Sequence, residues 1–183
     1  VDCCLALGGG SAIGLAKAIA LETHLPIIAI PTTYAGSEMT AVYGITENQL
    51  KTTGKAAQVL PKVVIYDPEL TLNLPTEISA CSGMNAMAHA VEALYAQDKN
   101  PIVSLMALEA ITQLAQALPE IVQAPHNMQA REHALYGAWL AGVCLGSVGM
   151  AIHHKICHSL GGRYQLPHAQ NHAIVLAYSV YYN

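Results

Sequence analysis

The sequence predicts an α/β fold in its first part and an all-α fold in the remainder. Short apolar runs that end in glycine, proline or hydroxyl residues occur before residue 75, which is typical of buried strands. After residue 75, apolar residues recur with helical spacing over longer stretches. Hydrophobic residues make up 53% of the 183 residues and charged residues only 11%, as expected for a deeply buried sheet and buried helices. We therefore place a domain boundary near residues 70–76, between 1–74 and 75–183.

The α/β part is expected to begin with a strand, a glycine turn and a helix. Residues 1–7 are apolar except for Asp2 and lead into Gly8-Gly9-Gly10-Ser11, after which helical spacing continues through Thr23. The later elements are a buried strand at 26–30, a loop at 31–38, a candidate strand at 41–46, a polar loop or hairpin at 49–58, and a short strand at 63–66. Strands that alternate with helices and loops in this way predict a sheet covered by helices.

The second part is expected to consist of five helices. Thr76 and Glu77 are suitable residues to open the first helix, and Pro101 to open the second. The predicted helices cover residues 76–95, 101–118, 131–148 and 152–160, the last ending at Gly161-Gly162, with a fifth beginning near 173.

Charge and cysteine content exclude several classes of protein. The formal net charge of −4, with only 8 Lys and Arg residues, argues against a nucleic-acid partner. No uninterrupted apolar run approaches the roughly 20 residues that span a bilayer, so we expect no membrane partner. Five cysteines without a C-x-x-C pair favour reduced thiols and a cytoplasmic location. Because the chain opens inside an apolar run and stops abruptly, we expect it to be an internal piece of a longer protein.

Two loops at strand ends are candidates for a nucleotide site. Gly8-Gly9-Gly10-Ser11 lies between a strand and a helix, where backbone N–H groups and the helix dipole can hold a phosphate. The pattern is not G-x-G-x-x-G, so a tight strand-to-helix turn is the alternative interpretation. The loop 31–38 follows the next strand and is rich in hydroxyl groups and glycine. Two such loops at the carboxyl edge of one sheet favour a bound nucleotide.

Histidines and one asparagine form a candidate catalytic pocket. Asn85 and His89 are four residues apart, as are His154 and His158, so each pair shares a helix face, and His168 follows. Such a set is typical of a three-histidine metal site with an oxygen ligand. An amide is a weaker donor than a carboxylate, which indicates a metal-site scaffold adapted to work without metal. Histidines satisfied within a core are the alternative.

Four nearby residues allow two interpretations each. His153 and His172 are either functional residues of the pocket or residues that support it or lie on the surface. Glu92 either orients His89 or is an exposed helix acid. Cys81 and Cys157 fit buried core positions better than nucleophiles.

Six motifs in fixed order resemble the iron-containing (group III) alcohol dehydrogenase superfamily. They are G-G-G-S at 8–11, P-T-T-x-A-G-S-E at 31–38, D-P-E-L at 67–70, G-M-N-A-x-x-H-A-x-E at 83–92, H-x-x-x-H at 154–158 and L-P-H at 166–168. The resemblance covers nearly the whole chain. It implies part of a Rossmann-like dinucleotide-binding domain followed by part of a helical catalytic domain, in the dehydroquinate synthase-like architecture, with the active site between them. A homodimer is usual for such proteins.

The resemblance also implies roles for individual residues. In the superfamily Asp, His, His and His hold the metal, and these positions correspond here to Asn85, His89, His154 and His168; His158 corresponds to a pocket histidine near the nicotinamide. Asn in the first position resembles the maleylacetate reductase branch, which is not regarded as metal-dependent. The implied contacts with NADH or NADPH are Gly9, Gly10, Ser11, Thr32, Thr33, Ser37, Lys51 and Leu70.

The implied reaction is NAD(P)H-dependent reduction of the C=C bond of a small dicarboxylate, maleylacetate or a substituted form, to 3-oxoadipate during aromatic degradation. Asn85, His89, His154, His158 and His168 are then the catalytic candidates, with His158 as the expected proton donor. One alternative is an iron- or zinc-dependent alcohol dehydrogenase in which Asn85 still offers its carbonyl oxygen to the metal. A non-catalytic assembly module is the other.

Overall fold

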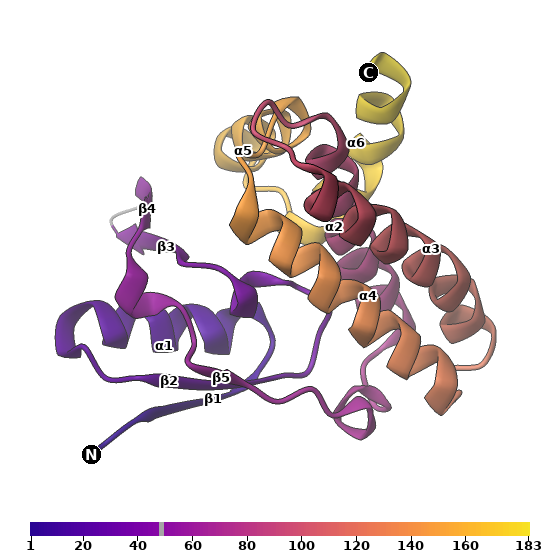
Figure 1. The fold of residues 1–183 in the computed structure, drawn as a ribbon. Coiled ribbons are helices and arrows are strands. Elements are labelled where there is room, and N and C mark those ends of the chain that lie inside the picture. The colour runs from indigo at the N-terminus through magenta and orange to yellow at the C-terminus, as the bar shows by residue number, and fades with distance from the viewer. Residues whose placement is uncertain (48–49) are drawn as a thin grey trace.

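A three-stranded parallel sheet with one covering helix forms the first part of the protein (Figure 1). The computed structural model describes all residues except 48–49, and all side chains except those of 46–51. Strands β1 (Cys4–Gly8), β2 (Ile27–Pro31) and β5 (Val63–Val64) are paired in the order β1-β2-β5, with Ala6 opposite Ala29. Helix α1 (Gly10–Thr23) packs on β1 and β2 and buries Ile13 and Ala16 against the sheet.

The polar segment after β2 forms a hairpin. Strands β3 (Val42–Glu47) and β4 (Leu50–Lys55) are antiparallel, with Val42 opposite Lys55, which confirms the expected strand and hairpin. Three short 3₁₀ helices connect the elements of this part: η1 (Ser37–Met39), η2 (Ala57–Val59) and η3 (Pro68–Thr71).

Five helices form the second part, as expected. They are α2 (Thr76–Tyr95), α3 (Pro101–Gln123), α4 (Met128–Ser147), α5 (Ile152–Tyr164) and α6 (His168–Tyr182). Helices α2, α3 and α4 pack on one another around a core of small residues that includes Ala107, Ala110 and Ala134. Helix α3 has the length and composition of a membrane span, but Leu114 and Ile121 on it are fully buried against its neighbours.

Four helix ends differ from the expected ones. Helix α3 continues through Pro119, because Ile121 beyond it is still buried in the core, and α4 begins three residues before Arg131. Helix α5 does not stop at its glycine pair: the left-handed C-cap is Gln165, with φ 54°. Helix α6 begins at His168, not near 173, because Pro167 takes the N-cap position.

A buried arginine joins the two parts of the chain. Nη1 of Arg131 donates to the hydroxyl oxygens of Tyr34, 3.1 Å away, and Ser79, 2.7 Å away. Nη2 donates to the Leu74 carbonyl at 3.2 Å. The backbone N–H of Tyr34 donates to Oγ of Ser82 on α2, which fixes the loop after β2 on the helical part. That the two parts are separate domains stays a prediction.

Candidate active site

The two loops expected to hold a nucleotide lie side by side at the carboxyl edge of the sheet. The Thr32 N–H donates to the Gly8 carbonyl at 3.0 Å. A Cβ atom at Gly9 would lie 2.9 Å from Cγ2 of Thr33, so only glycine lets the turn approach the second loop this closely. Gly8 has a φ of 147°, in the region that favours glycine. Gly10 opens α1, whose first turn is free of acidic residues, so its N–H groups suit an anion.

The other candidate cofactor residues differ in their exposure and in the elements on which they lie. Ser11 is exposed in the first turn of α1, and Oγ of Ser37 is buried without a hydrogen-bond partner among the described residues. Leu70 is 42% exposed on η3, which packs against α4. Lys51 belongs to β4, but its side chain lies outside the described part of the chain.

A buried lysine fixes the end of the second loop. The ammonium group of Lys17 on α1 donates to the carbonyls of Ser37, Thr40 and Val42 and to the Thr40 hydroxyl, at 2.6–3.0 Å. Burial lowers the pKa of Lys17 to about 8, although the charge of Glu38 raises it. Burial also raises the pKa of Glu38, whose Oε1 accepts a hydrogen bond from the Tyr66 hydroxyl group. None of these contacts was predicted from the sequence.

Asn85 and His89 lie buried on one face of α2, as their spacing predicts. They are 5% and 4% exposed. Asn85 Oδ1 and His89 Nδ1 are buried without hydrogen-bond partners among the described residues. Gly36, with a φ of 78°, brings the second loop to this face, because a Cβ there would lie 3.5 Å from His89 Nδ1 and 3.2 Å from Gly142 Cα. The loop after β2 and the face of α2 therefore meet at His89.

Helices α5 and α6 complete a cluster of six imidazoles. The ring of His89 stacks on that of His154 with centroids 5.0 Å apart, and His154 lies 4.7 Å from His172. His168 lies 4.3 Å from His172, and His158 lies 6.0 Å from His154. The sixth ring, that of His153, is 5.3 Å from His154. The structure thus brings all five predicted catalytic residues to one region, with His158 and His168 on its exposed side.

Glu92 contacts His154, so the expectation that it orients His89 is wrong, as is the alternative of an exposed acid. Its Oε2 lies 2.5 Å from His154 Nδ1, and its Oε1 accepts the His154 backbone N–H at 3.3 Å. Glu92 is fully buried. Burial alone would raise the pKa of this carboxyl group, but the hydrogen bond and charge of His154 outweigh it and lower the pKa. The carboxylate therefore orients His154 so that Nε2 faces the cluster.

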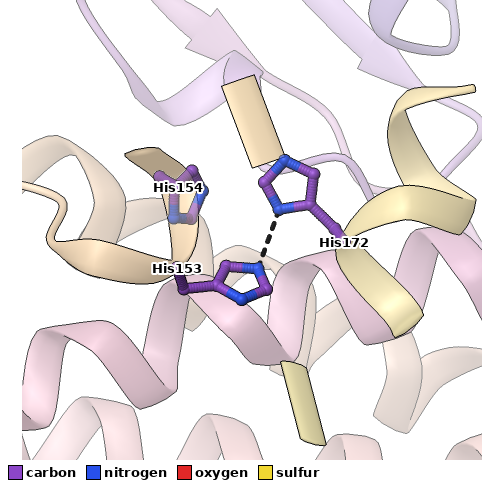
Figure 2. Close-up of side chains that lie close together, drawn as sticks. All are labelled: His153, His154 and His172. Atoms are coloured by element: carbon purple, nitrogen blue, oxygen red, sulfur yellow. Dashed lines mark hydrogen bonds between the residues drawn. The ribbon is translucent and has the colours of Figure 1, made fainter. Parts of the chain in front are cut away.

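His153 and His172 are fully buried, so the surface interpretation of both residues is also wrong (Figure 2). His153 Nε2 lies 3.0 Å from His172 Nδ1, and His153 Nδ1 lies 3.0 Å from Oγ of Ser179. Burial, followed by the neighbouring histidines, lowers the pKa of His172 to about 2 and that of His153 to about 4. The same causes lower the pKa of His89 well below its usual value. These three rings are therefore neutral at pH 7.

The donor atoms of the cluster suit a borderline metal ion. Asn85 Oδ1, His89 Nδ1, His154 Nε2 and His172 Nε2 are buried, and each is without a hydrogen-bond partner within the described structure. One ring nitrogen from each of His153, His154 and His172 lies within 4.8 Å of the others. Imidazole nitrogens with one amide oxygen match the ligand chemistry of zinc or iron(II). Three of these residues, Asn85, His89 and His154, belong to the predicted ligand set, and the fourth is His172 instead of the predicted His168.

The glycine loops lie at the ends of strands β1 and β2, and the six imidazoles lie on helices α2, α5 and α6. Residues 79–183 match the model of the Fe-containing alcohol dehydrogenase family, C-terminal, and residues 1–68 match the model of iron-containing alcohol dehydrogenase. The chain belongs to the iron-containing alcohol dehydrogenase family. The fold class expected from the sequence is thereby confirmed.

Several of the similar proteins are maleylacetate reductases. Maleylacetate reductase from Pseudomonas sp. (strain P51) is 59% identical over 100% of this chain and 52% of its own length. The crystal structure of maleylacetate reductase from Rhizobium sp. strain MTP-10005 is 59% identical, with a TM-score of 0.97 and the same coverage. Sulfoacetaldehyde reductase from Bifidobacterium kashiwanohense, in complex with NAD+, is 31% identical, with a TM-score of 0.92 over 100% of this chain and 54% of that one. The chain spans about half the length of the curated relatives it matches.

Proposed function

We propose that this protein reduces the C=C bond of maleylacetate, or of substituted maleylacetates, to 3-oxoadipate with NADH or NADPH and without a metal ion. The observation that carries the proposal is the 59% identity to maleylacetate reductases over the whole of this chain. Asn85 supports it, because a neutral amide stands where the family otherwise places a metal-binding carboxylate. We further propose a cytoplasmic homodimer without a nucleic-acid or membrane partner.

The glycine turn and the adjacent loop supply the cofactor end of the site. Gly9 and Gly10 present backbone N–H groups at the start of α1, and Thr32 and Thr33 lie beside them. A bound nicotinamide cofactor supplies a hydride, which adds to the alkene carbon β to the ketone. A relative that is 31% identical was crystallised with NAD+, which supports this assignment.

Hydride addition moves an electron pair from the alkene onto the ketone oxygen and forms an enolate. A proton then adds to the carbon α to the ketone, so one hydride and one proton are consumed for each product. Pocket donors must stabilise the enolate oxygen, and each such hydrogen bond contributes about 3 kcal/mol. The Asn85 amide is one buried candidate, and His154 is a second when both of its ring nitrogens carry a proton, because Glu92 accepts from Nδ1. His89 is neutral, so it can donate only from its protonated ring nitrogen.

His158 is the proposed proton donor. It lies one turn after His154 on α5, at the exposed side of the cluster, where a substrate has access. His168, at the first position of α6, faces it with ring centroids 6.3 Å apart. A His158→Ala enzyme should lose turnover while its affinity for NADH is retained. Unchanged turnover would remove His158 from this role.

The direct test is NADH oxidation by the chelator-treated, full-length protein on addition of maleylacetate. Rapid turnover with metal content below stoichiometric levels is the expected result. Activity that returns only with iron or zinc would contradict the metal-free proposal and retain the reductase activity. Binding of NADH without turnover of maleylacetate would contradict the proposal that maleylacetate is the substrate.

A second candidate is a metal-dependent alcohol dehydrogenase, and the unpartnered buried donor atoms favour it. Asn85 Oδ1, His89 Nδ1 and His154 Nε2 would hold the ion together with His168 or His172, and the ion would polarise a substrate oxygen. Metal content of the purified protein, together with oxidation of simple alcohols, distinguishes this candidate from the reductase.

A further inference from the structure

A hydrogen-bonded chain leads from Ser179 to His153 and on to His172, which are both members of the imidazole cluster; Figure 2 shows the bond between the two rings. Ser179 lies on α6, and it also lines an apolar groove between α5 and α6, together with Ile152 and Tyr178. Its Oγ lies 3.0 Å from His153 Nδ1, and His153 Nε2 lies 3.0 Å from His172 Nδ1. All three side chains are buried, with exposures of 3%, 0% and 0%.

The hydroxyl hydrogen of Ser179 sets the direction of the chain. Ser179 Oγ donates to the Leu176 carbonyl at 2.9 Å, and a hydroxyl has only one hydrogen. With that hydrogen assigned to the Leu176 carbonyl, the oxygen accepts from His153 Nδ1–H. Because a neutral imidazole carries one proton, His153 Nε2 is then an acceptor, and the hydrogen of its bond to His172 belongs to His172 Nδ1.

The surroundings of His153 agree with this direction. The Cys157 sulfur lies 3.7 Å from His153 Nε2, and burial raises the pKa of this thiol to about 11, so it remains protonated and can also donate to that nitrogen. The Asn171 side-chain amide donates to the Cys157 carbonyl at 2.8 Å and joins α6 to α5. The chain therefore lies in a fixed frame between two helices.

We infer that Ser179 and His153 are positioning residues that hold His172 as the Nδ1–H tautomer, with the lone pair of Nε2 directed into the active-site pocket. His172 Nε2 is buried and without a hydrogen-bond partner among the described residues. His154 is fixed in the same sense, because its Nδ1 faces Glu92. His172 thus acts as a hydrogen-bond acceptor in the pocket and is excluded from donating to the enolate oxygen. The catalytic part of this inference rests on the proposed reductase function.

The test is the tautomeric state of His153 and His172 in the full-length protein, measured by long-range ¹H–¹⁵N correlation NMR without substrate or cofactor. Both rings should carry their proton on Nδ1. In Ser179→Ala the His153 Nδ1–H loses its acceptor, so both rings should change to the Nε2–H form. Ser179→Thr, which keeps the hydroxyl, should restore the original state. The matched control is Ser147→Ala, because the exposed Ser147 makes the same kind of bond, to the Val143 carbonyl at 2.7 Å, away from any histidine.

Turnover provides the second measurement. The change of His172 to the Nε2–H tautomer in Ser179→Ala should lower kcat about 10-fold and leave the KM for NADH unchanged. Ser179→Thr should restore the wild-type kcat. An Nε2–H form of His153 in the wild-type protein would overturn the inference, even where Ser179→Ala fails to fold. Unchanged tautomers in a folded Ser179→Ala protein would also overturn it. Correct tautomers in a protein that does not reduce maleylacetate would contradict the proposed function and leave the positioning chain intact.

Discussion

The bond between Glu92 and His154 offers the sharpest mutational test of the site, through the variant Glu92→Gln. Glutamine has nearly the same shape, so it preserves packing at a fully buried position but removes the charge. The wild-type Oε2 lies 2.5 Å from His154 Nδ1, so the imidazole donates to a charged acceptor. The variant therefore tests how much the carboxylate charge contributes to holding and polarising His154.

The magnitude follows from the strengths of the two kinds of bond. A hydrogen bond to a charged group contributes about 1.5–3 kcal/mol and a neutral one about 1 kcal/mol, so the change removes roughly 0.5–2 kcal/mol. Acting on the transition state, this lowers kcat by about 2- to 30-fold. The KM for NADH should remain unchanged, because the glycine turn that we propose as the cofactor site is on another element.

Stability should show the same loss with a defined pH dependence. The pKa of Glu92 is lowered in the folded protein, so its contribution is present above the unfolded-state pKa and is lost as pH falls through the folded-state value. The difference in unfolding free energy between wild type and Glu92→Gln should thus be largest at neutral pH and shrink in acid.

The assays are NADH oxidation with maleylacetate and urea unfolding at several pH values. Glu132→Gln, at an exposed position on α4, serves as the matched control and should behave as wild type. Equal kcat values for Glu92→Gln and wild type, in a protein of native stability, would show that the carboxylate does not act on His154 during the reaction.

Three further predictions concern other parts of the chain. Gly9→Ala would place a methyl group 2.9 Å from Thr33 Cγ2, so NADH affinity measured by fluorescence should fall at least about 10-fold; unchanged affinity would exclude this turn from the cofactor site. The lowered pKa of His153, about 4, means that this ring binds more protons in the unfolded state below about pH 6.5, so its contribution to the unfolding free energy should fall by about 2 kcal/mol between pH 7 and pH 5. A His153→Asn variant should therefore show a shallower decline of unfolding free energy with falling pH in urea titrations. Arg131→Lys cannot reach all four partner oxygens, and a loss of about 3 kcal/mol in unfolding free energy is expected; a loss below about 0.5 kcal/mol would contradict the assigned role of the guanidinium group.

The elements that could be predicted from the sequence are those whose signal is local. The apolar runs before Gly8 and before Pro31 predict buried strands, and the glycines between strand and helix predict the turn. The predicted helix ends were wrong where the end of a helix depends on contacts with residues far away in the sequence. The polar residues 168–172 concealed the start of α6, because His172 and Asn171 face α5 and are buried instead of facing solvent.

The candidate site also contains residues that could be predicted from the sequence and residues that could not. Spacing alone placed Asn85 and His89 on one face and indicated a shared pocket with His154. Spacing could not assign Glu92, because a residue three positions from His89 lies at the edge of the same face, and only the approach of α5 decides which imidazole it contacts. The buried partners of Arg131 lie 52 to 97 residues away for its two hydroxyl contacts, so no local pattern could have indicated them.

The charges around the cluster explain why an asparagine is suited to this pocket. Glu92 is the carboxylate nearest to the imidazoles, and both of its oxygens contact His154 or Tyr95, so its charge is directed behind His154 and away from the pocket. An aspartate at position 85 would place a second negative charge in the pocket, where we propose that a doubly charged substrate binds. At 4 Å and an effective dielectric constant of 20, each such charge pair repels by about 4 kcal/mol. The amide removes that repulsion while it keeps a polar group at the same position, which is why we connect Asn85 with a dicarboxylate substrate.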